Sequence, residues 1–443
     1  MGDAPSSQDP SLKVLSDEYY DSKLSILAKN RKPDGIRSVL HLEQTPGIIS
    51  LLAGKPHPST FPFTSLSFTI RDPIDPAQET AVQLTQEELE TALQYSAGQG
   101  ILPLLEWAYG LQEITQNRKK GEGWKISFGN GSQDLIYKAV TALVNPGDSV
   151  LVEVPVYAGV SPMFQTIDCD IIEVEVDADG ILSSDIRKTL ENWPEGKPKP
   201  KVLYTVPYGG NPSGSTATLA RRLEILELAR VHDFIILEDD PYHYLYYGPT
   251  PRPPSYFALE KDSIEPGRVV RFDSLSKILS AGMRVGFVSG PAKLVQAMDA
   301  HSTVANLQPN TLAMVLTLAV MTRWGYDGFL KHTERVAQFY KAKRDVFQAA
   351  MVRHLSGLAE WSVPEAGMFM WFKLNLGDGP GDSDALIRSK AFERGVLALP
   401  GTAFYPNKRT SAYVRASFSM LGEDEVDEAL RRLKEAIIQA RGG

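Results

Sequence analysis

Residues 234–242 read Phe-Ile-Ile-Leu-Glu-Asp-Asp-Pro-Tyr. Four consecutive apolar residues without alternation predict a strand buried on both faces, as strands of parallel sheets are. The acidic residues come where this strand ends, and the Pro-Tyr pair begins a turn. Because ligands of open parallel sheets bind at the carboxyl ends of the strands, this stretch predicts both a layered fold and the position of its site.

Short apolar strands alternate with helices on both sides of this stretch. We expect further strands at 149–154 and 201–206, and long helices at 132–144 and 217–232. This alternation predicts an α/β fold in which a mostly parallel sheet lies between layers of helices.

Three parts are expected along the chain. An N-terminal arm covers residues 1–60, a large domain covers 61–324, and a smaller α+β domain covers 325–443. In the smaller domain we expect strands at 361–374 and 395–399.

Composition limits the classes of function. Lys plus Arg is 46 and Asp plus Glu is 54 in the 443 residues, so the formal net charge is −8 and binding to nucleic acid or to an anionic membrane is not expected. The single cysteine, Cys169, excludes an intramolecular disulfide. We find neither a run of about 18 apolar residues nor a signal sequence, so we expect a cytoplasmic protein without membrane spans.

Several common site motifs are incomplete in this sequence. Residues 129–134 begin like a dinucleotide fingerprint, but Asp134 stands where its third glycine should be. The seven histidines do not pair at the spacing of metal ligands, so no metal site is expected. Ser274 and Lys277 match the Ser-x-x-Lys pattern of serine acyl-enzymes, although the partner motifs of those enzymes are missing. A hydrolase therefore stays open as a distant alternative.

Polar residues able to carry chemistry follow three successive expected strands. Asn211 follows the strand at 201–206, Asp239 and Tyr242 follow the next, and Lys277 follows the strand at 268–272, with Arg284 seven residues further on. Each residue alone has an ordinary explanation in a turn or on the surface. Their common position at one edge of the sheet indicates a single site.

Four segments make the sequence recognisable: 93–96 (Leu-Gln-Tyr-Ser), 238–242 (Glu-Asp-Asp-Pro-Tyr), 273–277 (Asp-Ser-Leu-Ser-Lys) and 357–361 (Gly-Leu-Ala-Glu-Trp). With them, nearly the whole chain resembles the fold-type I pyridoxal-phosphate aminotransferases, and in particular the kynurenine/α-aminoadipate and fungal aromatic aminotransferases. The resemblance implies pyridoxal 5′-phosphate as the cofactor.

The resemblance also implies a role for each residue at the expected sheet edge. Lys277 would form a Schiff base with the cofactor and then move the proton at the substrate α-carbon. Asp239 would face the pyridine nitrogen and keep it protonated. Asn211 and Tyr242 would hydrogen-bond the ring 3-oxygen, and Tyr157 would stack on the ring.

The phosphate of the cofactor needs a fixed anion site. Ser132 and Gln133 open the helix at 132–144, so the free N–H groups of its first turn would face the anion. By resemblance, Ser274, Ser276 and Arg284 would add contacts. Tyr95 would reach the phosphate of the neighbouring subunit, which implies a homodimer with shared sites.

Substrate recognition is implied by the same resemblance. Arg415 would bind the α-carboxylate with its planar guanidinium, while Asn211 and Arg37 would touch the carboxylate or the side chain. The expected reaction moves an amino group from an aromatic, kynurenine or 2-aminoadipate type amino acid to 2-oxoglutarate. A pyridoxal-phosphate C–S lyase would use the same cofactor residues, so it remains an alternative.

Overall fold

The computed structural model describes residues 15–32, 35, 39, 41–52, 54–377, 379 and 381–441. The chain divides into two compact units. The first comprises Met1–Asn145 and Glu260–His332, and the second comprises Pro146–Leu259 and Thr333–Gly443. The three-part division expected from the sequence follows other boundaries and stays a prediction. Within the described residues, no helix is both long and apolar enough to cross a membrane.

Three strands of the first unit form an antiparallel run. β10 (Gly286–Pro291) lies between β3 (Trp124–Gly129) and β9 (Val269–Ser274). All residues of β9 and β10 are buried, including Arg271 and Asp273 of β9, which form an ion pair at 2.8 Å. In the register, Gly286 pairs with both Gly129 and Ser274, so the ends of the three strands come together.

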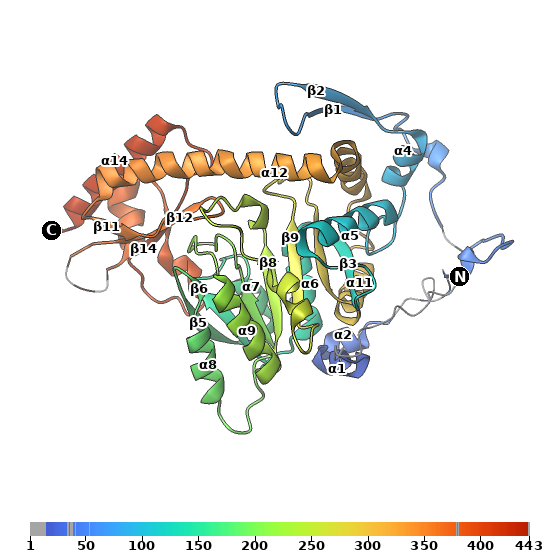
Figure 1. Cartoon of the computed structure of the whole chain (residues 1–443), viewed down its shortest axis with the longest axis horizontal. Helices are drawn as coiled ribbons and strands as arrows, with labels where there is room; N and C mark the ends of the chain where they lie inside the picture. The colour runs from blue at the N-terminus through green and yellow to red at the C-terminus, as the bar shows by residue number, and fades with distance from the viewer. Residues whose placement is uncertain are drawn as a thin grey trace. The chain divides into compact units, whose positions relative to one another are not determined.

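A hairpin in the first unit was not expected from the sequence. β1 (Ser67–Arg71) and β2 (Glu79–Gln83) pair antiparallel, and only Val82 of their residues is buried. Figure 1 shows this hairpin as a long two-stranded ribbon. Both strands have only five residues, and most of these are polar and exposed.

Helices complete the first unit. α4 begins with a capping box in which Thr85 and Glu88 exchange side-chain to backbone hydrogen bonds. The helix expected at 132–144 is confirmed as α6, which packs against α11. Among the described residues of the first unit, the helices before α12 are α1 (Asp17–Lys23), α2 (Ile26–Asn30), α4 (Gln86–Leu93), α5 (Leu102–Gln116), α6 (Ser132–Leu143) and α11 (Ala292–Ala305), with 3-10 turns η1 (His41–Gln44), η2 (Pro58–Thr60) and η4 (Glu260–Asp262).

The second unit contains the parallel strands that the sequence predicted. β8 (Ile235–Asp240), β7 (Val202–Thr205), β4 (Ser149–Val154) and β5 (Asp170–Asp177) are parallel neighbours in that order, and β6 (Gly180–Ile181) adds an antiparallel edge. Every residue of β4, β7 and β8 is buried. The accompanying helices are α7 (Ser161–Ile167), α8 (Ser183–Glu191), α9 (Leu219–His232) and α10 (Tyr256–Leu259), with the 3-10 turn η3 (His243–Leu245).

A second, antiparallel sheet lies in the same unit with the strand order β11-β12-β14-β13. The single strand expected at 361–374 is wrong, because β11 (Ala359–Trp361) ends before a loop and β12 (Phe369–Leu374) starts after it. Gly367 in that loop has a φ of 79°, which breaks an extended strand. β13 (Leu399–Pro400), β14 (Tyr413–Ser417), α13 (Ser383–Leu386), the π-helical turn η5 (Ile387–Ala391), the 3-10 turn η6 (Gly401–Phe404) and α14 (Glu423–Arg441) complete this part.

The long helical segment α12 (Thr311–Leu355) is interrupted at Gly325. This residue has φ 63° and ψ −178°, values that helical residues do not adopt. Glycine tolerates them because it has no Cβ. α12 is therefore two consecutive helices rather than one.

Candidate active site

The start of α6 in the first unit has the geometry of an anion site. Gly131, the residue before the helix, has a φ of 87°, a value that favours glycine. A Cβ at this position would lie 2.4 Å from Nη2 of Arg284, so the guanidinium packs directly over the helix start. Free backbone N–H groups and a positive helix end thus lie beside a permanent cation.

Arg284 is held in place by the loop around it. Its own φ is 55°, and its Nη1 donates to Ser276 Oγ at 3.1 Å and to the carbonyl of Ala281 at 3.2 Å. Its Nη2 donates to the carbonyl of Asn130 at 3.4 Å. Ser276 N in turn donates to Ser274 Oγ at 3.3 Å. The structure therefore brings Ser274, Ser276 and Arg284 to the start of α6, where Ser132 lies.

Lys277 lies on the same loop, three residues after the end of β9, and is half-buried. The turn that carries it is fixed from two sides. The backbone N–H of Leu275 donates to the carbonyl of Val285 at 3.1 Å, and the ring Nε2 of His332 lies 2.6 Å from the carbonyl oxygen of Ile278. The buried end of β9 thus places Lys277 next to the candidate anion site, which consists of Ser274, Ser276, Arg284 and the start of α6.

Tyr95 borders a surface cavity of about 460 Å³ in the first unit. The cavity is also lined by Asn130 and by the segment 306–311. Asn130 connects this cavity to the candidate anion site. The carbonyl oxygen of Asn130 accepts from Arg284, and its side-chain oxygen accepts from the backbone N–H of Asn310 at 3.1 Å. Tyr95 itself is 55% exposed, so it is available to a second molecule.

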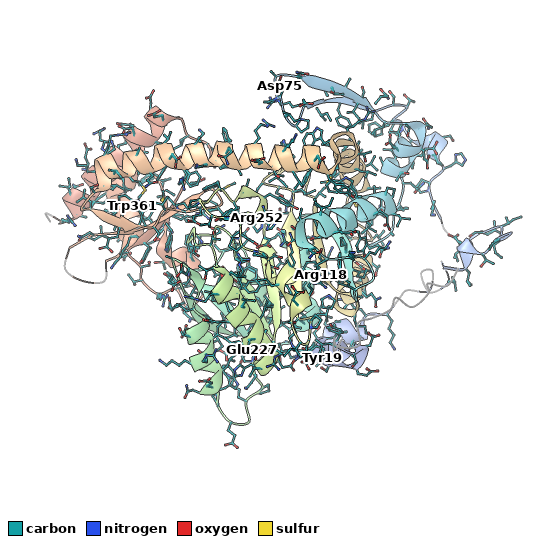
Figure 2. The ribbon with its side chains drawn as sticks, in the orientation of Figure 1. Tyr19, Asp75, Arg118, Glu227, Arg252 and Trp361 are labelled. Atoms are coloured by element: carbon teal, nitrogen blue, oxygen red, sulfur yellow. The ribbon has the colours of Figure 1, made fainter. Side chains whose placement is uncertain are left out.

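In the second unit, Asp239 is the penultimate residue of β8 and is only 3% exposed. Its Oδ2 accepts a hydrogen bond of 2.7 Å from the hydroxyl of Tyr204 on β7. Burial raises the pKa of Tyr242 well above its usual range, and the charge of Asp239 adds to this effect. Downstream of Tyr242, Arg252 (labelled in Figure 2) holds the next turn by donating to the carbonyl of His243 at 3.0 Å.

Arg415 on β14 is a positively charged residue of the second unit that contacts Asn211. Its Nη1 donates to Oδ1 of Asn211 at 2.9 Å, and its guanidinium carbon lies 4.2 Å from the ring centre of Phe369 and 5.1 Å from that of Phe404. Its Nε is buried and has no hydrogen-bond partner among the described residues. Burial lowers the pKa of Arg415, although the guanidinium stays charged. A half-buried arginine with an unused donor is suited to bind a carboxylate.

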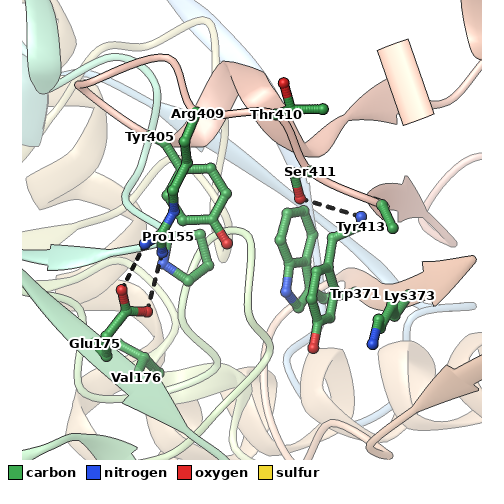
Figure 3. A pocket seen from close by; sticks show the side chains of 11 residues that line it. Pro155, Glu175, Val176, Trp371, Lys373, Tyr405, Arg409, Thr410, Ser411 and Tyr413 are labelled. Atoms are coloured by element: carbon green, nitrogen blue, oxygen red, sulfur yellow. Dashed lines mark hydrogen bonds and ion pairs between the residues drawn. The ribbon is translucent and has the colours of Figure 1, made fainter. Parts of the chain in front are cut away.

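An aromatic row continues from Arg415 across the antiparallel sheet. Trp371 pairs with Arg415 in the register, touches Phe404 edge-on and stacks on Tyr413 with ring centres 5.0 Å apart. Beyond them lies a polar cavity of about 320 Å³ (Figure 3). Arg409 spans part of its wall with a two-point ion pair to Glu175, at 2.7 and 3.0 Å. The face around Arg415 is therefore rich in aromatic rings.

Glu153 is a buried carboxyl group of β4 in the same unit. Its oxygens accept from Thr205 Oγ1 at 2.6 Å and from the backbone N–H of Val206 at 2.9 Å. Burial, aided by the charge of Asp239, raises the pKa of Glu153 from 4.5 to about 7. The role of Glu153 cannot be read from the sequence, because a glutamate within an apolar strand gives no indication of its neighbours.

The raised pKa of Glu153 predicts a pH dependence of stability. Between about pH 4.5 and 7 the folded protein holds this proton more tightly than the unfolded chain, so the free energy of unfolding should fall as pH rises, by up to about 3 kcal/mol. Glu153→Gln should remove this slope. Denaturant unfolding at pH 5 and pH 7.5 should show the variant gaining stability relative to wild type at the higher pH. A difference that is the same at both pH values would contradict the assignment.

Comparison with known proteins identifies the family. The sequence model of "Aminotransferase class I and II" matches residues 111–433. The chain belongs to this family. It is 44% identical to aminotransferase tdiD of Emericella nidulans, over 91% of this chain and 92% of that protein. It is 40% identical to the mitochondrial kynurenine/alpha-aminoadipate aminotransferase of Bos taurus, over 94% and 99% of the two chains.

A solved structure supports the same assignment. The kynurenine aminotransferase of Pyrococcus horikoshii, solved with PMP, superposes with a TM-score of 0.74 at 30% identity, covering 95% of this aminotransferase and 98% of that chain. The predicted α/β fold class, the family resemblance and the cofactor are thereby confirmed. This chain is an enzyme, a pyridoxal-phosphate-dependent aminotransferase.

The residues of this aminotransferase fit the cofactor. The helix start next to Arg284 offers backbone N–H groups, hydroxyls and a cation to a phosphate, and Gly131 keeps that cradle open. Buried Asp239 offers a carboxylate. Tyr157, which follows β4, lies against Gly159, where a Cβ would meet its ring at 2.5 Å. Arg37 lies outside the described residues.

Proposed function

We propose that this aminotransferase transfers the amino group of an aromatic, kynurenine or 2-aminoadipate type amino acid to 2-oxoglutarate. The observation that carries the proposal is the environment of Arg415. Its buried Nε is left for a carboxylate, and two aromatic rings flank its guanidinium within about 5 Å. The named relatives, two of which are kynurenine aminotransferases, support the same substrate class.

The polar residues of each unit have separate tasks in this proposal. Bound pyridoxal phosphate supplies a ring that withdraws electrons from the substrate α-carbon. Lys277 binds the cofactor and moves the proton at that carbon. Asp239 holds a proton at the pyridine nitrogen, while Asn211 and Tyr242 donate to the ring 3-oxygen and Tyr157 packs on the ring face.

Residues of the first unit would bind the phosphate of the cofactor. Ser132 and Gln133 would donate from the first turn of α6, and Ser274, Ser276 and Arg284 would complete the anion site. Arg284 already contacts Ser276 and the segment before the helix, so little rearrangement is needed. Substrate contacts from Asn211 and Arg37 complete the proposal, and the role of Arg37 stays a prediction.

A homodimer would complete the site through Tyr95. This tyrosine is exposed and lines a cavity. Asn130 lines the same cavity and accepts a hydrogen bond from Arg284 of the candidate anion site. Tyr95→Phe should weaken cofactor retention more than it lowers kcat, because one contact to the partner's phosphate is lost. Light scattering should report a dimer. A fully active monomer would contradict shared sites.

The expected cytoplasmic location of the protein also stays a prediction.

A panel of amino donors tests the proposed reaction. Each donor is incubated with 2-oxoglutarate, and both the keto acid and glutamate are measured. Tryptophan, phenylalanine, tyrosine, kynurenine or 2-aminoadipate should give both products in equal amounts. Pyruvate and ammonia formed without any acceptor would instead support the C–S lyase alternative. The family assignment leaves no support for the Ser-Lys hydrolase.

Arg415→Ala tests how the substrate binds. We expect KM to rise by about 10- to 100-fold for every donor, because a charge-assisted, two-point contact to the α-carboxylate is lost. Arg409→Ala is the matched control, since Arg409 also packs on an aromatic ring, at 4.0 Å from Tyr405, but is engaged by Glu175. Equal effects of the two variants would remove Arg415 from carboxylate binding.

A further inference from the structure

The carboxylate of Asp239 is almost completely removed from solvent, with 3% of the residue exposed. A buried carboxylate is stable only where other groups donate to it. The hydroxyl of Tyr204 donates to Oδ2 of Asp239 at 2.7 Å, the usual distance for a hydrogen bond from a hydroxyl group. Tyr204 is itself fully buried, so water does not compete for this bond.

The two residues lie on adjacent parallel strands. In the register of β7 and β8, Tyr204 pairs with Leu237, so Asp239 is two residues further along β8 and on the same face as Leu237. Two residues of strand span roughly 6.6 Å, which a tyrosine side chain leaning along the strand can bridge. Because both strands are entirely buried, the hydrogen bond fixes the carboxylate from a rigid base.

The charges around this pair make the donor important. Glu153 is a second buried carboxyl that interacts with Asp239, and the charge of Asp239 helps to raise the pKa of Glu153, so the two groups disfavour being ionised together. Burial and the charge of Asp239 raise the pKa of Tyr204 well above its usual range, so its hydroxyl keeps its proton and always donates. Loss of this donor would shift Asp239 toward its protonated, neutral form, because burial disfavours the charged carboxylate.

We propose that Tyr204 is a positioning residue that keeps Asp239 ionised and oriented toward the pyridine nitrogen of the cofactor. The proposal rests on the function proposed for Asp239. Tyr204 touches neither substrate nor cofactor in this account and acts only through the carboxylate. Its loss should shift the proton shared by Asp239 and the ring nitrogen toward the carboxylate.

The test is Tyr204→Phe, read by nitrogen NMR on holoenzyme loaded with ¹⁵N-pyridoxal 5′-phosphate. In wild type the ring nitrogen should give the shift of a protonated pyridine. In the variant the signal should move toward that of an unprotonated pyridine, with kcat lower by about 10- to 100-fold and KM of the donor within about twofold. An unchanged nitrogen signal in a loaded variant would overturn the proposal.

Tyr256→Phe is the matched control. Tyr256 is a fully buried tyrosine of the same unit, and its hydroxyl has no hydrogen-bond partner among the described residues. Its ring lies beside Arg222, at 5.6 Å, a contact that phenylalanine keeps. This variant should keep the wild-type nitrogen signal and kcat. The same nitrogen shift in both variants would mean that loss of any buried hydroxyl produces it, and the proposal would fail.

A second substitution covers the case in which Tyr204→Phe does not fold. 3-Fluorotyrosine placed at position 204 keeps the shape of the side chain and makes its hydroxyl a stronger donor, so ring protonation should be retained. A shift toward the unprotonated pyridine would overturn the proposal. Failure of the proposed substrate panel would leave this readout intact, because the nitrogen signal needs no turnover.

Discussion

Lys277→Ala is expected to abolish transamination, with kcat lower by at least about 10⁴-fold. The substitution removes the amine that binds the cofactor and the base that moves the substrate proton, and a positioned acid-base group alone contributes about 10² to 10⁴. The fold should persist, because Lys277 lies in a turn held by backbone hydrogen bonds and by His332. Product formation and thermal unfolding measure the two effects.

Lys125→Ala is the control for this prediction. Lys125 is a partly buried lysine of the same unit, paired with Asp299 at 2.8 Å. The Lys125→Ala variant should have a slightly lower free energy of unfolding and an unchanged kcat. Turnover by Lys277→Ala at more than a few per cent of the wild-type rate would mean that another lysine serves the reaction.

Asp239→Asn has the second largest expected effect, a loss of about 10²-fold or more in kcat. The amide has no charge to keep the ring nitrogen protonated, and loss of such a preorganised contact raises the barrier by about 3 kcal/mol. Cofactor should still bind through its phosphate, which absorbance of the purified variant would show.

Asp240→Asn separates the two neighbouring carboxylates. Asp240 is also buried, at 2% exposure, and it ends β8. Because side chains alternate along a strand, it points to the opposite face from Asp239. Asp240→Asn should affect stability rather than kcat. Near-normal kcat in Asp239→Asn, with a large loss in Asp240→Asn, would reverse the assignment.

The sequence predicted the buried strands well for a physical reason. β8 is a run of apolar residues that ends in acidic ones, and β4 is apolar except for Ser149 and Glu153. Full burial on both faces favours such continuous apolar runs. The hairpin of β1 and β2 was missed although Phe68 and Ile70 alternate with polar residues in β1, because each strand has only five residues and both are largely exposed. The strand at 361–374 was overextended, since a positive φ at Gly367 cannot be read from composition.

Within the candidate site, only residues that belong to recognisable sequence motifs were predicted. Arg284, Ser276 and the start of α6 do lie together, and Arg415 does contact Asn211. Tyr204 and Phe369 were missed, because their roles depend on register between strands far apart in the chain. Tyr204 gave one signal, a polar-tipped side chain within the apolar run before Asn211.

Borohydride reduction of the holoenzyme, followed by peptide mass mapping, tests the central claim most directly. Reduction fixes the cofactor to the amine that holds it. The account predicts one modified lysine, Lys277, in a purified protein that is yellow before reduction. A cofactor adduct on any other lysine, or a protein that binds no pyridoxal phosphate, would contradict it.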